Sequence, residues 1–156
     1  MKSFYFYETF IGKIAIGSDG ESITDLCFGI QGITEKFREK EMDVIKKASQ
    51  ELVDYFSGKL QHFSVPLNPK GTDFMKKVWG ALQKIPHGKT ASYKDIAELS
   101  GHPKAYRAVG LANNKNPIPI FIPCHRVIGT NGKLTGFRGG LDLKQKLLDL
   151  ERKSTY

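Results

Sequence analysis

A cysteine late in the chain has neighbours that suit nucleophilic chemistry. Cys124 is followed by His125 and Arg126 within residues 119–128, an apolar run that contains two prolines. A nearby imidazole or guanidinium favours the thiolate, the form of cysteine that attacks carbon. Each proline fixes its own φ and pushes the preceding residue toward extended geometry, so we expect a stiff, buried, non-helical segment. A packing role is the alternative, because cysteine is often buried for packing alone.

Length and composition are those of a globular protein. The chain has 156 residues, 40% hydrophobic and 26% charged, enough for one domain or two small ones. We see no secretory signal in the first ten residues, and no apolar run approaches the roughly 20 residues of a membrane helix. We therefore predict a soluble protein, cytoplasmic in a prokaryote or nuclear in a eukaryote. Two distant cysteines and four scattered histidines predict neither a disulfide nor a zinc site.

Charge divides the chain into two parts. Up to Pro69, eight Lys and Arg face ten Asp and Glu, a net of −2; from Lys70 onward sixteen face six, a net of +10. A part this basic favours a polyanionic partner, because Lys and Arg contacts to phosphate release counterions. A solubilising surface is the alternative. The sign changes within the proline-containing segment 60–71, so we predict a linker there between two domains, residues 1–69 and 70–156.

The first part has the pattern of a small sheet covered by a helix. Short aromatic or β-branched segments bounded by turn residues predict an antiparallel meander; its strands are residues 4–9, 12–18 and 22–29. Cys27 lies in the third strand and is interpreted as a packing residue. Apolar residues at helical spacing predict a helix over residues 41–57.

The second part begins with three predicted helices. Thr72 can cap the first, and the spacing of Ser92 and Asp95 fits a capping box that opens the second. The third covers residues 104–113 after a glycine-containing turn, which predicts a helix-turn-helix. This third helix is rich in Ala and Gly and carries Arg107, which suits close approach to a duplex and insertion of one cation. Tight packing in an all-α domain is the alternative.

The chain ends with a predicted hairpin and a helix. An Asn-Gly turn signal within residues 129–134 predicts that residues 127–128 and 134–135 pair as the wing of a winged helix. In the predicted helix over residues 141–152, Glu151 falls among leucines. A buried carboxylate needs a partner, and His125 is the leading candidate.

Several separated motifs together resemble one family. The run Pro-Cys-His-Arg-Val at 123–127, preceded by Asn116 and followed by Gly-Gly-Leu at 139–141, resembles the methylated-DNA–protein-cysteine methyltransferases, which repair O6-alkylguanine. Ser-Tyr at 92–93, Arg-Ala-Val-Gly at 107–110 and Glu151 match as well. The resemblance is strong from Thr72 to Glu151 and weak before Pro69. It implies an α+β fold, with a ribonuclease H-like sheet and helix followed by a mostly helical winged helix-turn-helix domain.

The resemblance also implies a mechanism. The damaged nucleotide is flipped out of the duplex. Glu151 then orients His125, which deprotonates Cys124 through a water, and the thiolate takes the alkyl group while Tyr93 donates a proton toward the guanine. The thioether product is irreversible, so each molecule repairs one lesion, without metal or cofactor. O4-alkylthymine is a possible second substrate.

Further roles follow from the resemblance alone. Asn116 braces the active-site turn, Tyr93 crowds the phosphate of the flipped nucleotide, and Arg107 fills the gap left in the stack. The protein is expected to be a monomer that binds the minor groove of double-stranded DNA through Tyr93, Lys94, His102, Ala105, Arg107 and Thr130. The substrate pocket is assigned to Val127, Arg138 and Pro119. Arg138 replaces a small residue of some relatives, which bears on the acceptance of bulky alkyl groups.

Two other classes of function fit parts of the sequence. A non-repairing winged-helix DNA-binding protein would not need Cys124. A cysteine hydrolase would use Cys124 and His125 in direct contact. Adjacent residues of an extended segment point to opposite faces, so a water bridge, as in the methyltransferase, fits better.

Overall fold

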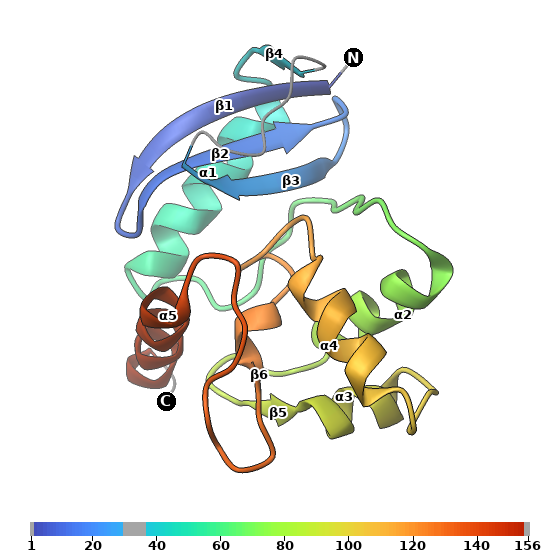
Figure 1. Ribbon diagram of the computed structural model, residues 1–156. Coiled ribbons are helices and arrows are strands. Elements are labelled where there is room, and N and C mark those ends of the chain that lie inside the picture. Colours follow the sequence, from blue (N-terminus) through green and yellow to red (C-terminus); the bar gives the residue numbers. More distant parts are fainter. Residues whose placement is uncertain (1, 30–36, 155–156) are drawn as a thin grey trace. The chain divides into compact units, whose positions relative to one another are not determined.

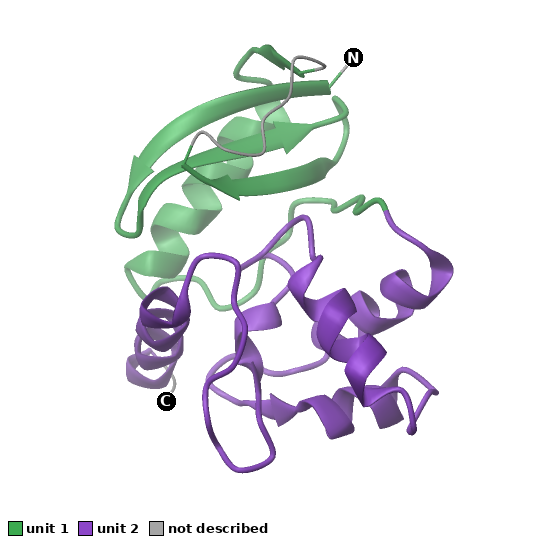
Figure 2. Cartoon of the chain, in the orientation of Figure 1, with its two compact units in different colours: residues 1–70 green, residues 71–156 purple. Residues whose placement is uncertain are grey.

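The chain forms two compact units. The computed structural model describes residues 2–29 and 37–154. The units comprise residues 1–70 and 71–156 (Figure 2).

The first unit is a four-stranded sheet with one helix (Figure 1). Its strand order is β3-β2-β1-β4, and the elements are β1 (Lys2–Thr9), β2 (Gly12–Ser18), β3 (Ile23–Phe28), β4 (Phe37–Glu39) and α1 (Asp43–Phe56). The three predicted strands and the helix are confirmed. The sheet is mixed rather than antiparallel, because the unpredicted β4 pairs in parallel with β1. Buried residues of α1 recur every three or four positions, which gives the helix one apolar face: Ile45, Ala48, Leu52 and Tyr55.

The predicted linker is in part a component of the first unit. Ile23 N donates to Pro66 O at 2.8 Å, and Asn68 N donates to Ile23 O at 2.8 Å. Leu67 thereby forms a parallel bridge with Ile23 beside the sheet. The predicted linker over 60–71 therefore includes paired backbone, because the segment around Pro66 satisfies its hydrogen bonds on the start of β3.

The second unit is mostly helical. Its elements are α2 (Asp73–Leu82), β5 (Ala91–Ser92), α3 (Tyr93–Leu99), α4 (Tyr106–Asn114), the 3-10 helix η1 (Cys124–Arg126), β6 (Val127–Ile128) and α5 (Leu141–Lys153). Thr72 accepts from Met75 N at 3.2 Å, and Ser92 and Asp95 form the predicted capping box. Trp79, on α2, donates its Nε1–H to Ala112 O at 2.9 Å and is buried, which fixes α2 against α4.

The predicted strand pairing of the wing is wrong. β6 pairs in parallel with β5, not with residues 134–135. The Asn-Gly turn does form, and Gly129 N donates to Lys133 O at 2.9 Å, but no strand follows it. A local turn signal does not reveal a partner strand far earlier in the chain. Among the residues described, no helix has the length and apolarity to span a membrane.

Candidate active site

Cys124 opens a single 3-10 turn rather than lying in an extended segment. The turn η1 holds Cys124, His125 and Arg126, all of them buried, and its N-cap is Pro123. The prediction of extended geometry through Cys124 is therefore wrong. Consecutive residues of a 3-10 turn lie about 120° apart around the axis, so Cys124 and His125 do not point to opposite faces.

Asn116 holds the loop that leads into this turn. Its Oδ1 accepts from Ile118 N at 3.0 Å and its Nδ2 donates to Ile122 O at 2.8 Å. Between these two contacts, Ile120 has a φ of +74°, a conformation that a β-branched residue rarely adopts. Such a residue costs about 1–3 kcal/mol and persists when surrounding contacts over-determine it. The Asn116 amide supplies two of those contacts.

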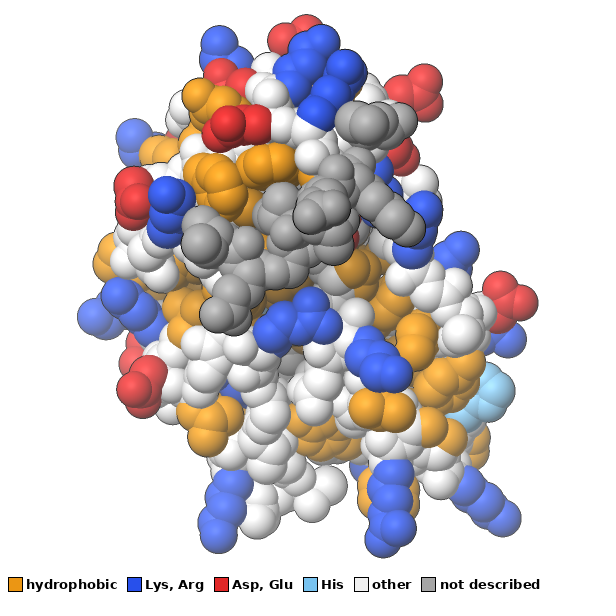
Figure 3. Space-filling view, turned by 45° about the horizontal axis from the view of Figure 1, so that its top comes forward, with side chains coloured by type: hydrophobic (Ala, Val, Ile, Leu, Met, Phe, Trp, Pro, Cys, Tyr) orange, Lys and Arg blue, Asp and Glu red, His pale blue; other side chains and the backbone are white. Residues whose placement is uncertain are grey.

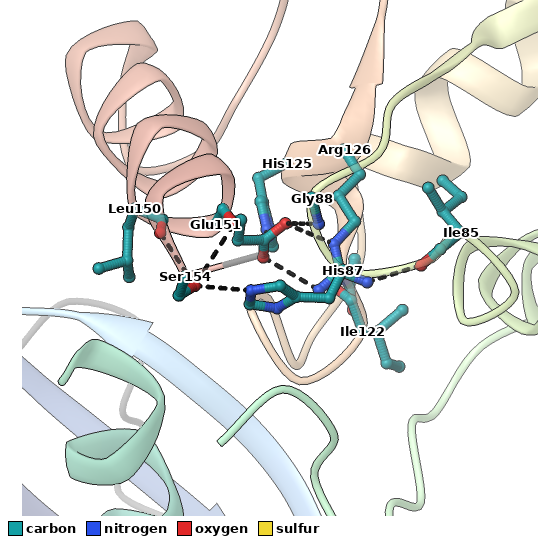
Figure 4. Close-up of polar contacts among 10 residues, drawn as sticks. Ile85, His87, Gly88, Ile122, His125, Arg126, Leu150, Glu151 and Ser154 are labelled. Carbon is teal, nitrogen blue, oxygen red and sulfur yellow. Dashed lines mark hydrogen bonds and ion pairs between the residues drawn. The ribbon is translucent and has the colours of Figure 1, made fainter. Parts of the chain in front are cut away.

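His125 and Arg126 both bind the carboxylate of Glu151 from α5 (Figure 4). Nε2 of His125 lies 2.7 Å from Oε2 of Glu151. The Arg126 guanidinium binds the same carboxylate as a fork, Nε to Oε1 at 2.8 Å and Nη2 to Oε2 at 3.0 Å. His125 and Glu151 are 0% exposed, so this pair is fully removed from water. The predicted pairing of Glu151 with His125 is confirmed.

The protonation states of His125 and Glu151 determine the tautomer of His125. Burial alone would raise the pKa of Glu151, but the hydrogen bonds from His125 and Arg126, together with the positive charge of Arg126, hold it well below its ordinary value. Burial lowers the pKa of His125, with Glu151 opposing that shift, so the imidazole is neutral. A carboxylate can only accept, so Nε2 carries the proton. Nδ1, buried and without a hydrogen-bond partner among the described residues, is then the basic nitrogen.

Cys124 is held as a thiol. Burial raises its pKa to about 11, and the Asn116 side chain and the charges of Lys144 and Arg138 oppose that rise only in part. The expectation that adjacent cations favour the thiolate is wrong, because Arg126 is bound to Glu151 and His125 is neutral. Cys124 therefore needs a base at the moment of reaction.

Lys144 is a buried cation that sequence reasoning missed. It is 0% exposed, and its Nζ donates to Thr135 O at 2.6 Å. Burial lowers its pKa to about 8, against the opposing effect of Cys124. The missed signal was helical spacing: Lys144 precedes Glu151 by two turns and lies on the face of Leu147 and Leu148, which are buried.

A hollow of about 630 Å³ adjoins the helix-turn-helix. It brings together three predicted DNA-contact residues, Tyr93, Lys94 and Thr130, with others that were not predicted: Pro103, Lys104, Tyr106, Gly129 and Thr135. The Tyr93 hydroxyl shares a hydrogen bond of 2.8 Å with Thr135 Oγ1. Cys124 is not part of this lining.

The other predicted residues lie around the site in different settings. Arg107 is exposed on α4, Ala105 is the N-cap of that helix, and the ring of His102 packs edge-on against Phe74 with centroids 5.1 Å apart. Two of the predicted pocket residues, Val127 and Pro119, are buried, and Arg138 is exposed with its Nη2 donating to Asn114 O at 3.1 Å. Within residues 2–29 and 37–154, no group of three or more His, Cys, Asp or Glu could hold a metal ion.

Both units match known protein families. A family model described as 6-O-methylguanine DNA methyltransferase, DNA binding domain, matches residues 73–153. A second, described as 6-O-methylguanine DNA methyltransferase, ribonuclease-like domain, matches residues 3–69.

Individual relatives agree over most of their length. A methylated-DNA–protein-cysteine methyltransferase of Methanosarcina acetivorans is 49% identical, covering 93% of this chain and 95% of the relative. A constitutive enzyme of the same name from Bacillus subtilis is 44% identical, covering 93% and 92%. The crystal structure of Mycobacterium tuberculosis OGT in complex with DNA matches with a TM-score of 0.92 at 42% identity, covering 97% and 94%. The chain belongs to the 6-O-methylguanine DNA methyltransferase family.

Proposed function

We propose that this chain repairs O6-alkylguanine in double-stranded DNA by moving the alkyl group to its own Cys124. The observation that carries the proposal is the buried Cys124 beside His125, whose Nε2 is held by Glu151 at 2.7 Å. That arrangement provides a thiol and a neutral base in a buried site. The family and its relatives perform direct DNA repair by alkyl transfer.

The transfer follows from the ionisation of the site. Nδ1 of His125 accepts the Cys124 proton through a water, while Glu151 steadies the imidazolium that results. The sulfur attacks the alkyl carbon, an S–C bond forms, and the bond between that carbon and O6 breaks. The departing guanine takes a proton from the Tyr93 hydroxyl, which the hydrogen bond with Thr135 holds in place. The product is a thioether, so each molecule acts once.

DNA binding is assigned to the basic second part of the chain. Residues from Lys70 onward carry a net charge of +10. On the face drawn in Figure 3, Lys and Arg side chains are spread over the whole view. We assign contacts with the DNA backbone to Lys94 and Thr130, which line the hollow, and to His102 in the turn before α4. The small Ala105 lets α4 approach the minor groove.

Nucleotide flipping needs two further side chains. Arg107, exposed on α4, fills the gap in the base stack, and Tyr93, at the start of α3, crowds the phosphate.

Val127, Pro119 and Arg138 form the alkyl pocket, and Asn116 keeps its wall in place. Residues 1–69 support the domain of residues 70–156. The protein acts as a monomer in the cytoplasm.

Mass spectrometry of the protein after mixing with a duplex that carries one O6-methylguanine tests the proposal. We expect one added methyl group, located on the peptide that contains Cys124, and at most one per molecule even with excess DNA. A Cys124→Ala variant should bind the same duplex and gain no methyl group. Binding of wild-type protein without methyl transfer would indicate a non-repairing DNA-binding protein, and modification at another residue would also contradict the proposal.

A further inference from the structure

The turn between α2 and β5 contacts both members of the buried ion pair of Arg126 and Glu151. Ile85 O accepts from Arg126 Nη1 at 2.6 Å, and Gly88 N donates to Glu151 Oε1 at 3.4 Å. The turn itself is closed by Lys89 N donating to Pro86 O at 3.1 Å. One short segment therefore orients the Arg126 guanidinium and the Glu151 carboxylate together. Any shift of this turn changes the position of both groups.

The His87 side chain fastens this turn to the end of α5. Its Nε2 lies 2.8 Å from Ser154 Oγ, and both residues are 7% exposed (Figure 4). Ser154 is the C-cap of α5, and its hydroxyl donates to Leu150 O at 3.0 Å. Since the hydroxyl has one proton, its oxygen accepts from His87, and Nε2 of His87 carries a hydrogen.

The position of Glu151 at the end of α5 makes its carboxylate sensitive to the hydrogen bond between His87 and Ser154. Glu151 is in the last turn of the helix, where backbone carbonyls lack helical partners and the chain frays most readily. The Ser154 hydroxyl reaches one of those carbonyls, Glu151 O, at 3.4 Å. His87 ties Ser154 to the turn that touches Glu151. We propose that His87 and Ser154 are positioning residues that hold the Glu151 carboxylate on His125 and so maintain the base that deprotonates Cys124. This inference rests on the proposed function.

The expected effect is on the chemistry rather than on DNA binding. In His87→Ala and Ser154→Ala we expect single-turnover methyl transfer to slow about tenfold, as for other groups that orient a reactive ligand, with duplex affinity unchanged. The double variant should be no slower than the slower single variant, because the two side chains act through one hydrogen bond. Restoring the donor in His87→Gln or the hydroxyl in Ser154→Thr should recover most of the rate.

A second readout separates positioning from general stability. The charges that affect His125 are Glu151, Arg126 and Lys144, and among these Glu151 raises its pKa. A loosened carboxylate should therefore lower the pKa of His125 further. The acidic limb of the transfer rate, and the ring titration of His125 by NMR, should both shift to lower pH in His87→Ala.

Controls are a matched C-cap serine and an exposed histidine of the first unit. Ser57, the C-cap of α1, donates to Asp54 O at 3.0 Å, and His62 is exposed. Ser57→Ala and His62→Ala should leave the rate and the His125 titration unchanged. If His87→Ala does not fold, Ser154→Ala decides. Wild-type rate and wild-type His125 titration in the folded variants would overturn the positioning role, whereas absence of transfer by the wild-type protein would overturn the proposed function instead.

Discussion

Cys124 combines low exposure with a pKa that burial raises to about 11. At neutral pH it is therefore a thiol. A reagent whose reaction is not assisted by deprotonation of Cys124 by His125 meets a low concentration of thiolate. We expect iodoacetamide to modify Cys124 slowly at pH 7 and faster as the pH rises toward 11. Peptide mass spectrometry measures the rate of this modification. Modification at pH 7 as fast as that of a cysteine in an unfolded peptide would contradict this. Cys27, half-buried in β3, is the internal comparison.

Glu151 stabilises the fold as well as the base. Removing one partner of a buried pair leaves the other charge uncompensated, so Glu151→Gln should lower the free energy of unfolding by about 3–5 kcal/mol at pH 7. The folded pKa of Glu151 lies well below its ordinary 4.5, so the carboxylate's contribution is complete above pH 4.5 and decreases as the pH falls below it. Urea unfolding at pH 7 and pH 3 should show the difference between the two proteins shrinking. An unchanged difference would contradict the linkage.

Some contacts of the site could be predicted from residue types, and other contacts could not. Glu151 was found because a carboxylate among leucines at helical spacing has to be buried and paired. The fork of Arg126 on Glu151, and the contact of His87 with Ser154, depend on which backbone turn packs beside the end of α5. Tertiary packing determines which turn lies there, so no local sequence pattern predicts these contacts.

Among the elements, helices were predicted well because capping and periodicity are local. The boundaries of α2 and α3 follow from Thr72 and Ser92, whose side chains bond backbone N–H groups three residues on. The pairing of β6 with β5 was missed, since two-residue strands carry no periodicity. The 3-10 turn at Cys124 was missed because the prolines indicate only that an α-helix cannot run through them.

The loop before Cys124 depends on one amide. In Asn116→Ala, Ile118 N and Ile122 O lose their side-chain partners in a buried setting, at about 1–3 kcal/mol for each group. On that basis we expect the free energy of unfolding to fall by roughly 2–6 kcal/mol. Transfer from both duplex DNA and free O6-benzylguanine should also be slower. Thermal unfolding and single-turnover rates measure the two effects. Asn114→Ala, at an exposed position of α4, should be near wild type; equal behaviour of the two variants would contradict the brace.

At the scale of the whole molecule, the two units differ in charge as their proposed roles require. Lys94 is exposed at the hollow beside the helix-turn-helix. If it contacts a phosphate, Lys94→Ala should weaken duplex binding and reduce the slope of log affinity against log salt by about 1. Fluorescence anisotropy over a salt series checks this. Lys59→Ala, outside the basic part, is the control, and an unchanged slope in Lys94→Ala would remove Lys94 from the interface.

Arg107 separates what the molecule does to DNA from what it does to the alkyl group. The side chain is exposed on α4, whereas Cys124, His125 and Glu151 are buried. A guanidinium that fills the gap in the base stack stabilises only the flipped nucleotide, whereas a free base needs no flipping. Arg107→Ala should therefore slow methyl transfer from duplex DNA while leaving transfer from free O6-benzylguanine unchanged, both read by mass spectrometry of Cys124. Equal slowing of both reactions would place Arg107 in the chemistry, and no slowing of either would exclude the gap-filling role.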